Sequence, residues 1–420
     1  MKKTALSLLI IVQTMFCLAQ EMPTAPKFKF YGNVRIDTYY NSRQMEEAAE
    51  GFWLSYPKPE ALDAFGNDLN GQSMAGMTAT ASRFGFDFLP FRVDKLNMNL
   101  SGKIETDFQG FGGTATVMRI RHAYLNMNFG KSDVLAGQNW HPFYDNCAPQ
   151  VLDLNGGSPY QPFGRSPQLR YSYTTNDLKI YGAAVYQIQF TSFGPNGRSH
   201  VYQRNAKLPE LVAGLDYKAG DFKLGAGAEY KQIEPRTTAT INIDNVAQTV
   251  AVDEKLPSAA VNAYVQYSHN LLTLKAKGTF GQNLSDMQML GGYAVTDENA
   301  RGERSYKPFN VVSTWLSADY KFGENSPFAL NIFGGYSKNL GTDHAIKGDV
   351  YGNVMFNNQM LSETWRGSTN LSYTLTHWRL ALEYDFNRAY YGKLKTENGK
   401  AENAEGINGN RVLAVLQFFF

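Results

Sequence analysis

Apolar and polar residues alternate one by one along many segments of this chain. Residues 222–230 place Phe, Leu, Ala, Ala and Tyr on one face and Lys, Gly, Gly and Glu on the other. Residues 378–387 repeat the pattern with Trp, Leu, Leu, Tyr and Phe opposite Arg, Ala, Glu, Asp and Asn, and residues 96–108 carry a similar charged face. A period of two residues indicates β-strands. The chain is therefore expected to be all-β.

Alternation alone is compatible with a secreted β-sandwich, a β-helix or an outer-membrane barrel, because a membrane barrel has the same pattern with its apolar face turned outward. The apolar faces here begin and end in aromatic residues, as the pairs Phe222 and Tyr230, Trp378 and Phe386 show. Two aromatic belts at a fixed separation are typical of segments that cross both interfaces of a bilayer. This observation favours the membrane barrel.

The connections between these segments alternate between short and long. Short links are expected near 92–95, 130–133, 174–177, 218–221, 268–271, 323–327 and 374–377, and long ones near 43–76, 109–114, 142–166, 193–207, 234–256, 282–307, 339–360 and 391–409. Strands then start near 28, 77, 96, 115, 133, 167, 178, 208, 222, 257, 271, 308, 328, 361, 378 and 410. An even strand number with both termini at the short-turn end is the rule for bacterial outer-membrane barrels. We therefore predict a 16-stranded antiparallel transmembrane β-barrel.

Two further features concern single strands. The chain stops inside its last strand, and Phe418, Phe419 and Phe420 resemble the terminal signal by which outer-membrane proteins are recognised for insertion. Arg119 and Arg121 share parity with apolar residues 123–129 of the same strand, which would turn the two charges toward lipid. Either a β-bulge lies near His122 or part of this strand faces protein, and a bulge is the commoner explanation.

The N-terminus and the composition define the compartment. Lys2 and Lys3, the apolar residues 5–16 and the sequence Cys-Leu-Ala at 17–19 indicate a signal peptide over 1–19, which leaves the barrel domain as 20–420. Removal of the two lysines from 40 basic residues leaves 38, equal to the 38 acidic residues, so there is no basic excess of the kind that nucleic-acid binding needs. Only Cys147 remains, which excludes an internal disulfide. A mean hydropathy of -0.37 and the lack of internal runs of about 18 apolar residues exclude a helical membrane protein.

Three short motifs carry a family resemblance, in the order residues 119–124 (Arg-Ile-Arg-His-Ala-Tyr), 136–140 (Ala-Gly-Gln-Asn-Trp) and 164–171 (Gly-Arg-Ser-Pro-Gln-Leu-Arg-Tyr). Together with sixteen strands, a long third loop and a terminal Phe, they resemble the trimeric Gram-negative porins, and more narrowly the DcaP-like porins. The resemblance implies a homotrimer in the outer membrane, in contact with lipid and lipopolysaccharide. It also implies a third loop folded into the lumen and a preference for anionic organic solutes.

A barrel of this size leaves an aqueous lumen, where charges count for more than on an open surface. Inward parity and the third loop select the candidate constriction residues, which are Arg35, Arg83, Arg119, Arg121, Arg170, Arg411, Asp145 and Asp153. Arg35, Arg83, Arg170 and Arg411 lie on strands one, two, six and sixteen, which are expected to adjoin near the third loop. An arginine ladder opposite the loop acids would orient a dipolar solute and bind carboxylates.

Two classes of function remain open, a passive diffusion channel and a barrel-borne enzyme or surface adhesin. The six histidines are scattered and fall in no nucleophile elbow or metal-ligand spacing, so neither catalysis nor a cofactor is expected. Loop aspartates Asp145, Asp153, Asp343 and Asp349 could take a lipopolysaccharide-bridging cation, but solvated carboxylates are the favoured interpretation and no metal site is expected. We predict a porin for small hydrophilic solutes with modest preference for organic anions.

Overall fold

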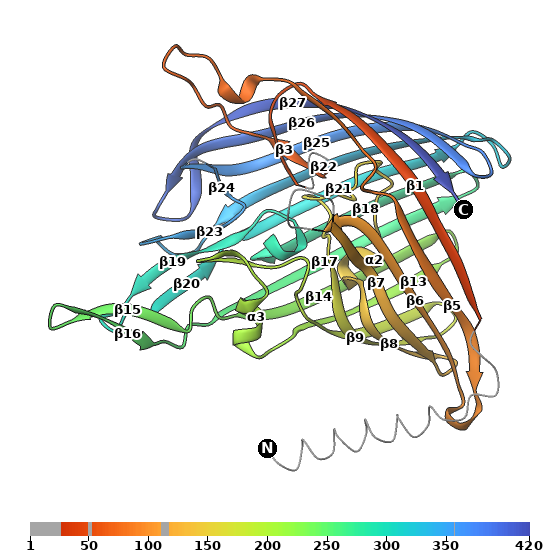
Figure 1. The fold of residues 1–420 in the computed structure, drawn as a ribbon, viewed down its shortest axis with the longest axis horizontal. Coiled ribbons are helices and arrows are strands. Elements are labelled where there is room, and N and C mark those ends of the chain that lie inside the picture. Colours follow the sequence, from red (N-terminus) through yellow and green to blue (C-terminus); the bar gives the residue numbers. More distant parts are fainter. Residues whose placement is uncertain (1–26, 49–52, 111–116, 357) are drawn as a thin grey trace.

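The computed structural model describes residues 27–48, 53–110, 117–356 and 358–420, so the expected signal peptide lies outside the described residues. Sixteen long strands form a closed antiparallel barrel (Figure 1). They are β1 (Phe28–Asn41), β5 (Arg83–Val93), β6 (Met98–Gly110), β7 (Val117–Asn128), β8 (Ser132–Trp140), β9 (Arg165–Thr174), β10 (Leu178–Val185), β13 (Glu210–Ala219), β14 (Phe222–Ile233), β17 (Leu256–His269), β18 (Leu272–Gln282), β21 (Asn310–Lys321), β22 (Phe328–Gly341), β25 (Gln359–Thr374), β26 (Trp378–Lys395) and β27 (Lys400–Phe419). The predicted fold class is confirmed.

The long loops contain further short elements. The short strands β4 (Met74–Thr78) and β24 (Met355–Phe356) add to the edge of the barrel, and small sheets or hairpins are formed by β2 (Met45–Ala48), β3 (Trp53–Pro57), β11 (Phe193–Gly194), β12 (Gly197–Arg198), β15 (Thr238–Ile243), β16 (Val246–Ala251), β19 (Gly292–Glu298), β20 (Arg304–Pro308) and β23 (Val350–Gly352). The helical turns are η1 (Leu69–Gly71), η2 (Asp94–Leu96), α2 (Pro142–Asp145), α3 (Val201–Ala206) and η3 (Leu284–Met287). No helix of the described residues is long and apolar enough to cross a membrane.

The wall has the inverted pattern of a membrane barrel. Along β26, Trp378, Leu382 and Phe386 are exposed on the outside, whereas Glu383 and Asp385 are fully buried on the inside. Aromatic pairs lie at both rims of the outer surface, with ring centroids 4.9 Å apart for Phe222 and Tyr267 at the short-turn end and 4.3 Å apart for Tyr336 and Trp365 near the loops. The apolar face is therefore turned toward lipid and the charged face toward the interior.

The barrel closes between its first and last strands. β1 and β27 pair antiparallel from Asn33 opposite Phe419 to Asn41 opposite Arg411. Gly32 and Phe420 extend this ladder, since each backbone N–H donates to the carbonyl of the other at 3.0 Å. The Phe420 ring lies directly over Gly32, where a Cβ would come within 2.6 Å of the ring. Every strand edge of the wall is thereby paired, as a bilayer requires.

Two of the expected boundaries are wrong. Residues 391–409 are not a long loop, because β26 continues to Lys395 and β27 starts at Lys400, so that only residues 396–399 connect them. The second strand is interrupted, with β4 ending at Thr78 and β5 starting at Arg83. Outside the membrane both faces of a strand meet water, so the pattern of alternation that marks a strand is lost there.

The irregularity in the fourth strand is a β-bulge, as predicted. Glu105 of β6 pairs with His122 of β7, but the next residue, Thr106, pairs with Ile120. Arg121 is therefore the extra residue, and the side chains of Arg119 and Arg121 both turn toward the interior.

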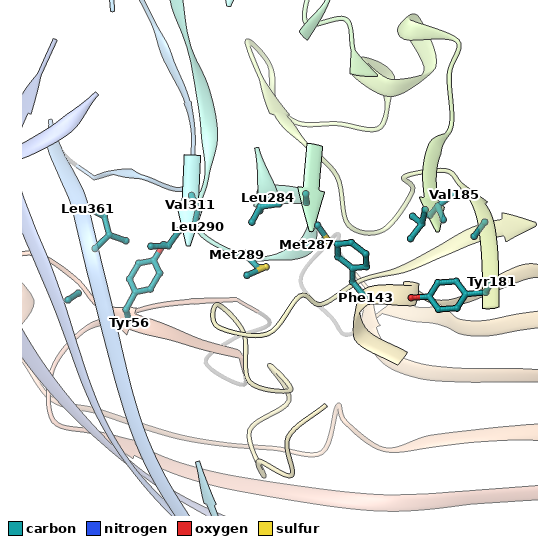
Figure 2. Close-up of a cluster of buried hydrophobic side chains, with 14 of the residues drawn as sticks. Tyr56, Phe143, Tyr181, Val185, Leu284, Met287, Met289, Leu290, Val311 and Leu361 are labelled. Carbon is teal, nitrogen blue, oxygen red and sulfur yellow. The ribbon is translucent and has the colours of Figure 1, made fainter. Parts of the chain in front are cut away.

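Three loops pack inside the wall near its loop end. Loop 1 (residues 42–82), loop 3 (141–164) and loop 6 (283–309) contribute Tyr56, Phe143 and Leu290 to one buried apolar cluster (Figure 2). Wall residues on the inner face, among them Val185 and Val311, complete this cluster. Only the third loop was expected to do so, because short apolar stretches in the other loops carry no periodicity.

Candidate functional site

Loop 3 connects β8 to β9 and bonds to side chains of the opposite wall. The backbone N–H groups of Leu152 and Asp153 donate to the two carboxylate oxygens of Glu383 on β26, at 2.7 and 3.0 Å. The guanidinium of Arg35 on β1 donates to the carbonyl of Leu152 at 2.8 Å. A carboxylate that accepts two consecutive N–H groups forms strong, charge-assisted hydrogen bonds. The middle of loop 3 is thereby held against β26 and β1.

A second set of contacts holds the end of loop 3. The hydroxyl of Tyr160 lies 3.0 Å from that of Thr364 on β25, and the indole N–H of Trp315 on β21 donates to the side-chain carbonyl of Gln161 at 2.8 Å. The Tyr160 ring packs on Gly335 of β22, where any Cβ would collide with it. The loop therefore has fixed positions on two parts of the wall.

The eight residues selected from the sequence all carry a charged partner. Arg35 pairs with Asp37 at 2.8 Å, and Arg83 lies 3.9 Å from Glu105. The two loop acids bind predicted arginines directly, Asp145 to Arg170 at 2.9 Å and Asp153 to Arg411 at 3.6 Å. Arg119 and Arg121 both pair with Asp107, at 2.8 and 3.0 Å.

The four arginines that were expected to adjoin near the third loop lie in two groups on the wall. The strands β27, β1 and β5 do adjoin, so Arg411, Arg35 and Arg83 lie on neighbouring strands. Arg170 lies on β9, which is separated from β5 by β6, β7 and β8. Loop 3 connects the two groups instead, since its Asp145 reaches Arg170 and its Asp153 reaches Arg411.

Six side chains on β5, β6, β7 and β9 form what we call the cationic cluster: Arg83, Arg119, Arg121, Arg165, Glu105 and Asp107. Arg121 bonds to both carboxylates, at 2.6 Å to Glu105 and 3.0 Å to Asp107. Three of the four guanidinium groups, those of Arg83, Arg119 and Arg121, contact the two carboxylates. The cluster has an excess of positive charge that the described residues do not neutralise.

Arg165, the first residue of β9, is the member that the sequence did not single out. Its side chain is fully buried, and within the described part of the chain none of its three nitrogens has a hydrogen-bond partner. The guanidinium instead lies 4.9 Å from the ring centre of Trp140, 5.9 Å from that of Phe163 and 5.7 Å from that of Phe190. Such cation–π contacts compensate only part of the lost hydration.

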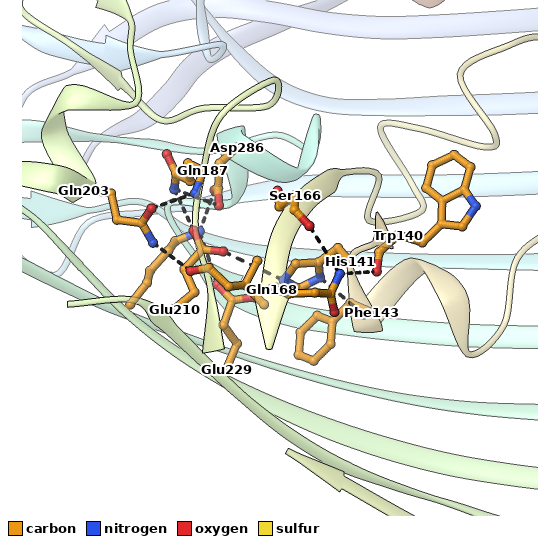
Figure 3. A network of polar contacts seen from close by, with 12 residues as sticks. Trp140, His141, Phe143, Ser166, Gln168, Gln187, Gln203, Glu210, Glu229 and Asp286 are labelled. Atoms are coloured by element: carbon orange, nitrogen blue, oxygen red, sulfur yellow. Dashed lines mark hydrogen bonds and ion pairs between the residues drawn. The ribbon is translucent and has the colours of Figure 1, made fainter. Parts of the chain in front are cut away.

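On the other side of loop 3, Glu210, Glu229 and Asp286 form what we call the carboxylate cluster (Figure 3). Lys231 forms ion pairs with Glu229 and Asp286. One oxygen from each carboxylate lies within 4.8 Å of the other two, and all three side chains are buried. Of the three, only Glu229 belongs to a segment described from the sequence, where it lies on the polar face of residues 222–230. The four loop aspartates considered for calcium lie outside this cluster, and Asp349 is bound by Arg304 at 2.9 Å.

A polar hollow of about 590 Å³ opens at the short-turn end, beneath loop 3. Gln150 of loop 3 and inward side chains such as Lys275, Asp319, Asn331 and Arg379 line it. Water can therefore enter the lumen from this end and reach the underside of loop 3.

The comparisons with known proteins agree with this architecture. Residues 20–223 match the model of the DcaP outer membrane protein family. The structure of the outer membrane channel DcaP of Acinetobacter baumannii is similar with a TM-score of 0.69 and 19% identity, covering 95% of this chain and 99% of that chain. No curated protein matches the chain by sequence.

Other porins share the fold at lower similarity. The trimer form of OmpT from Vibrio cholerae has a TM-score of 0.57 and 12% identity over 94% of this chain and 100% of that chain. The anion-selective porin from Comamonas acidovorans has a TM-score of 0.54 and 10% identity over the same shares. The chain therefore shares the sixteen-stranded fold of these outer-membrane channels, and its N-terminal half is similar to the DcaP family, as its sequence motifs indicate.

Proposed function

We propose that this porin is a passive diffusion channel for small hydrophilic solutes, with a modest preference for organic anions. The observation that carries the proposal is the positive excess of the cationic cluster at the root of loop 3. Arg83 brings this excess to the lumen, because its side chain is 24% exposed and its carboxylate partner Glu105 is 3.9 Å away. The Nε of Arg83 has no hydrogen-bond partner among the described residues.

An anion that passes loop 3 would be attracted most strongly by an exposed guanidinium such as that of Arg83. The loop and the wall exclude much of the water there, so that charges are weakly screened. A guanidinium presents paired N–H donors that match the two oxygens of a carboxylate. Arg35, Arg170 and Arg411 contribute less, because the side chain of each is less than 10% exposed.

The proposal includes the assembly expected from the family resemblance, a homotrimer of mature chains that start after residue 19. Support comes from the OmpT neighbour, whose structure is described as a trimer form. Light scattering of the protein in mild detergent should give a protein mass near three chains, and a mass of one chain would contradict the trimer.

Reversal potentials in a salt gradient across a planar bilayer test the selectivity. Replacing Arg83 and Arg170 together with Ala should move the potential toward cation selectivity. Asp145→Asn should move it in the opposite direction, because the Asp145 side chain is 42% exposed and can act on solutes. Arg92→Ala is the matched control, since Arg92 lies at a short turn outside the loop 3 region. If the double variant keeps the potential of the unmodified protein, the anion preference is wrong.

A further inference from the structure

The carboxylate cluster has unbalanced charge and is almost entirely shielded from solvent. Glu210, Glu229 and Asp286 are 2–4% exposed, and Lys231 is 1% exposed. One ammonium group beside three ionised carboxylates leaves two negative charges. Buried charge of this size is strongly unfavourable unless a cation or protons compensate it.

The nearby donors satisfy some of the carboxylate oxygens but not all of them. Lys231 Nζ lies 2.5 Å from one oxygen of Asp286 and 3.3 Å from Glu229 Oε1. The side-chain amide of Gln187 donates to Glu210 Oε1 at 2.6 Å and to the second oxygen of Asp286 at 3.2 Å. Glu229 Oε2 is buried and has no hydrogen-bond partner in the described residues.

His141 points toward the three carboxylates but forms no hydrogen bond with them. Its Nε2 lies 3.7 Å from Glu229 Oε2 and 3.9 Å from Glu210 Oε2, too far for a hydrogen bond, and it has no other partner in the part of the chain described. Its Nδ1 accepts the backbone N–H of Phe143 at 3.2 Å, which places the ring proton on Nε2. The imidazole is therefore a donor aimed at the cluster (Figure 3) and not a metal ligand.

The other cations of this region are engaged elsewhere. Arg198 donates to the carbonyls of Thr191 and Ser285, and Lys277 donates to carbonyl oxygens of loop 3. Neither forms an ion pair with the three carboxylates among the contacts of the described residues. The two excess charges therefore remain.

We propose that Glu210, Glu229 and Asp286 bind one calcium ion. Calcium prefers oxygen ligands at about 2.3–2.6 Å. Two oxygens on opposite sides of the ion are therefore separated by about twice this distance. This separation is close to the 4.8 Å within which the three carboxylate oxygens lie. The charge of the ion cancels the excess of the cluster. Because Glu210 and Glu229 lie on β13 and β14 and Asp286 lies in loop 6, the ion ties loop 6 to the wall beside the root of loop 3.

Calorimetric titration tests the site with protein refolded from denaturant into detergent, free of lipopolysaccharide, after chelator treatment. Calcium should bind at one site per chain, and more tightly than magnesium, whose shorter bonds of about 2.0–2.1 Å the cluster does not match. Uptake of protons alone, without calcium binding at millimolar concentration, would overturn the proposal.

Charge variants separate a calcium site from a structural network. Glu210→Gln and Asp286→Asn should each weaken calcium binding about tenfold or more, a change of about 1.4 kcal/mol or more. Lys231→Gln should strengthen it, because a like charge beside the ion is removed. Asp343→Asn, which changes an exposed loop carboxylate, is the matched control. Circular dichroism and heat-dependent migration in gels establish that each variant is folded. Folded Glu210→Gln protein that binds calcium as tightly as the unmodified chain would contradict the assignment.

Discussion

The two charged clusters flank the root of loop 3 and have opposite excess charge. Trp140, the last residue of β8, lies against Arg165 of the cationic cluster, whereas the next residue, His141, points toward the carboxylate cluster. Each cluster also contains side chains of the opposite charge. These are Asp107 and Glu105 in the cationic cluster and Lys231 in the carboxylate cluster. In both, the polar groups of the described residues leave two unit charges uncompensated.

Exposure separates the roles of the two clusters. Arg83 and Arg119 in the cationic cluster are 24% and 16% exposed, so a solute in the lumen can approach the positive charge. The carboxylate cluster is closed to solutes, because its three acids and Lys231 are all nearly fully buried. An accessible excess charge can act on passing solutes, whereas an enclosed one needs a resident ion.

The largest expected effect follows when a cluster loses a side chain whose charge is opposite to the excess charge of that cluster. Asp107→Ala leaves Arg119 and Arg121 without their shared carboxylate and should lower the free energy of unfolding by about 3–5 kcal/mol. Lys231→Ala should cost a similar amount in chelator, and added calcium should restore part of the loss only in this second variant. Denaturant titrations of both variants in detergent measure the difference. If calcium changed the free energy of unfolding of both variants equally, the two clusters would not differ in the way described.

Acid should act on the carboxylate cluster through His141. Burial lowers the pKa of His141 to about 3 from an ordinary value of 6.5, since the imidazolium would lose its hydration. The unfolded state therefore binds the proton first, and stability is lost as the pH falls from 6.5 toward 3. The loss should reach about 2 kcal/mol at pH 5. His141→Asn keeps an acceptor for the N–H of Phe143 and should remove this part of the pH dependence, measured as unfolding midpoints between pH 7 and pH 5.

The smallest expected effect concerns Arg165. Replacing a buried guanidinium that lacks a carboxylate partner with Met keeps the contact with Trp140 and removes the desolvation cost, so stability should rise by about 1 kcal/mol. The reversal potential should shift little, because Arg165 is fully buried. Unfolding curves and bilayer recordings of Arg165→Met check the two parts. A marked loss of stability would show that the positive excess is compensated in the native protein.

The sequence predicts the wall well because lipid and water select residues on alternate positions. Strands such as β14 and β26 start where the alternation starts, at Phe222 and Trp378. The alternation is lost where the strands extend beyond the membrane. The sequence therefore predicted a loop for the part of the β26–β27 hairpin beyond residue 391.

The sites are less predictable, because they depend on residues that meet only in the folded chain. Glu210, Glu229 and Asp286 come from two strands and a loop, and each alone resembles an ordinary hydrated wall acid. Parity did select Arg83 and Arg170, and the third loop supplied Asp145, the partner of Arg170. Arg165 was missed because the expected strand began at residue 167, two positions after it.

The seam between β1 and β27 determines the order in which the chain can assemble. Neighbouring strands elsewhere are joined by their own turns or loops and can pair as hairpins, whereas Asn33 and Phe419 come from opposite ends of the chain. Contacts between distant residues form slowly, because a long segment must be ordered first. The first strand therefore keeps an open edge until the final residues have been exported, and such an edge invites pairing with other chains. The open edge of β1 is therefore covered only when the strand that ends at Phe419 pairs with it.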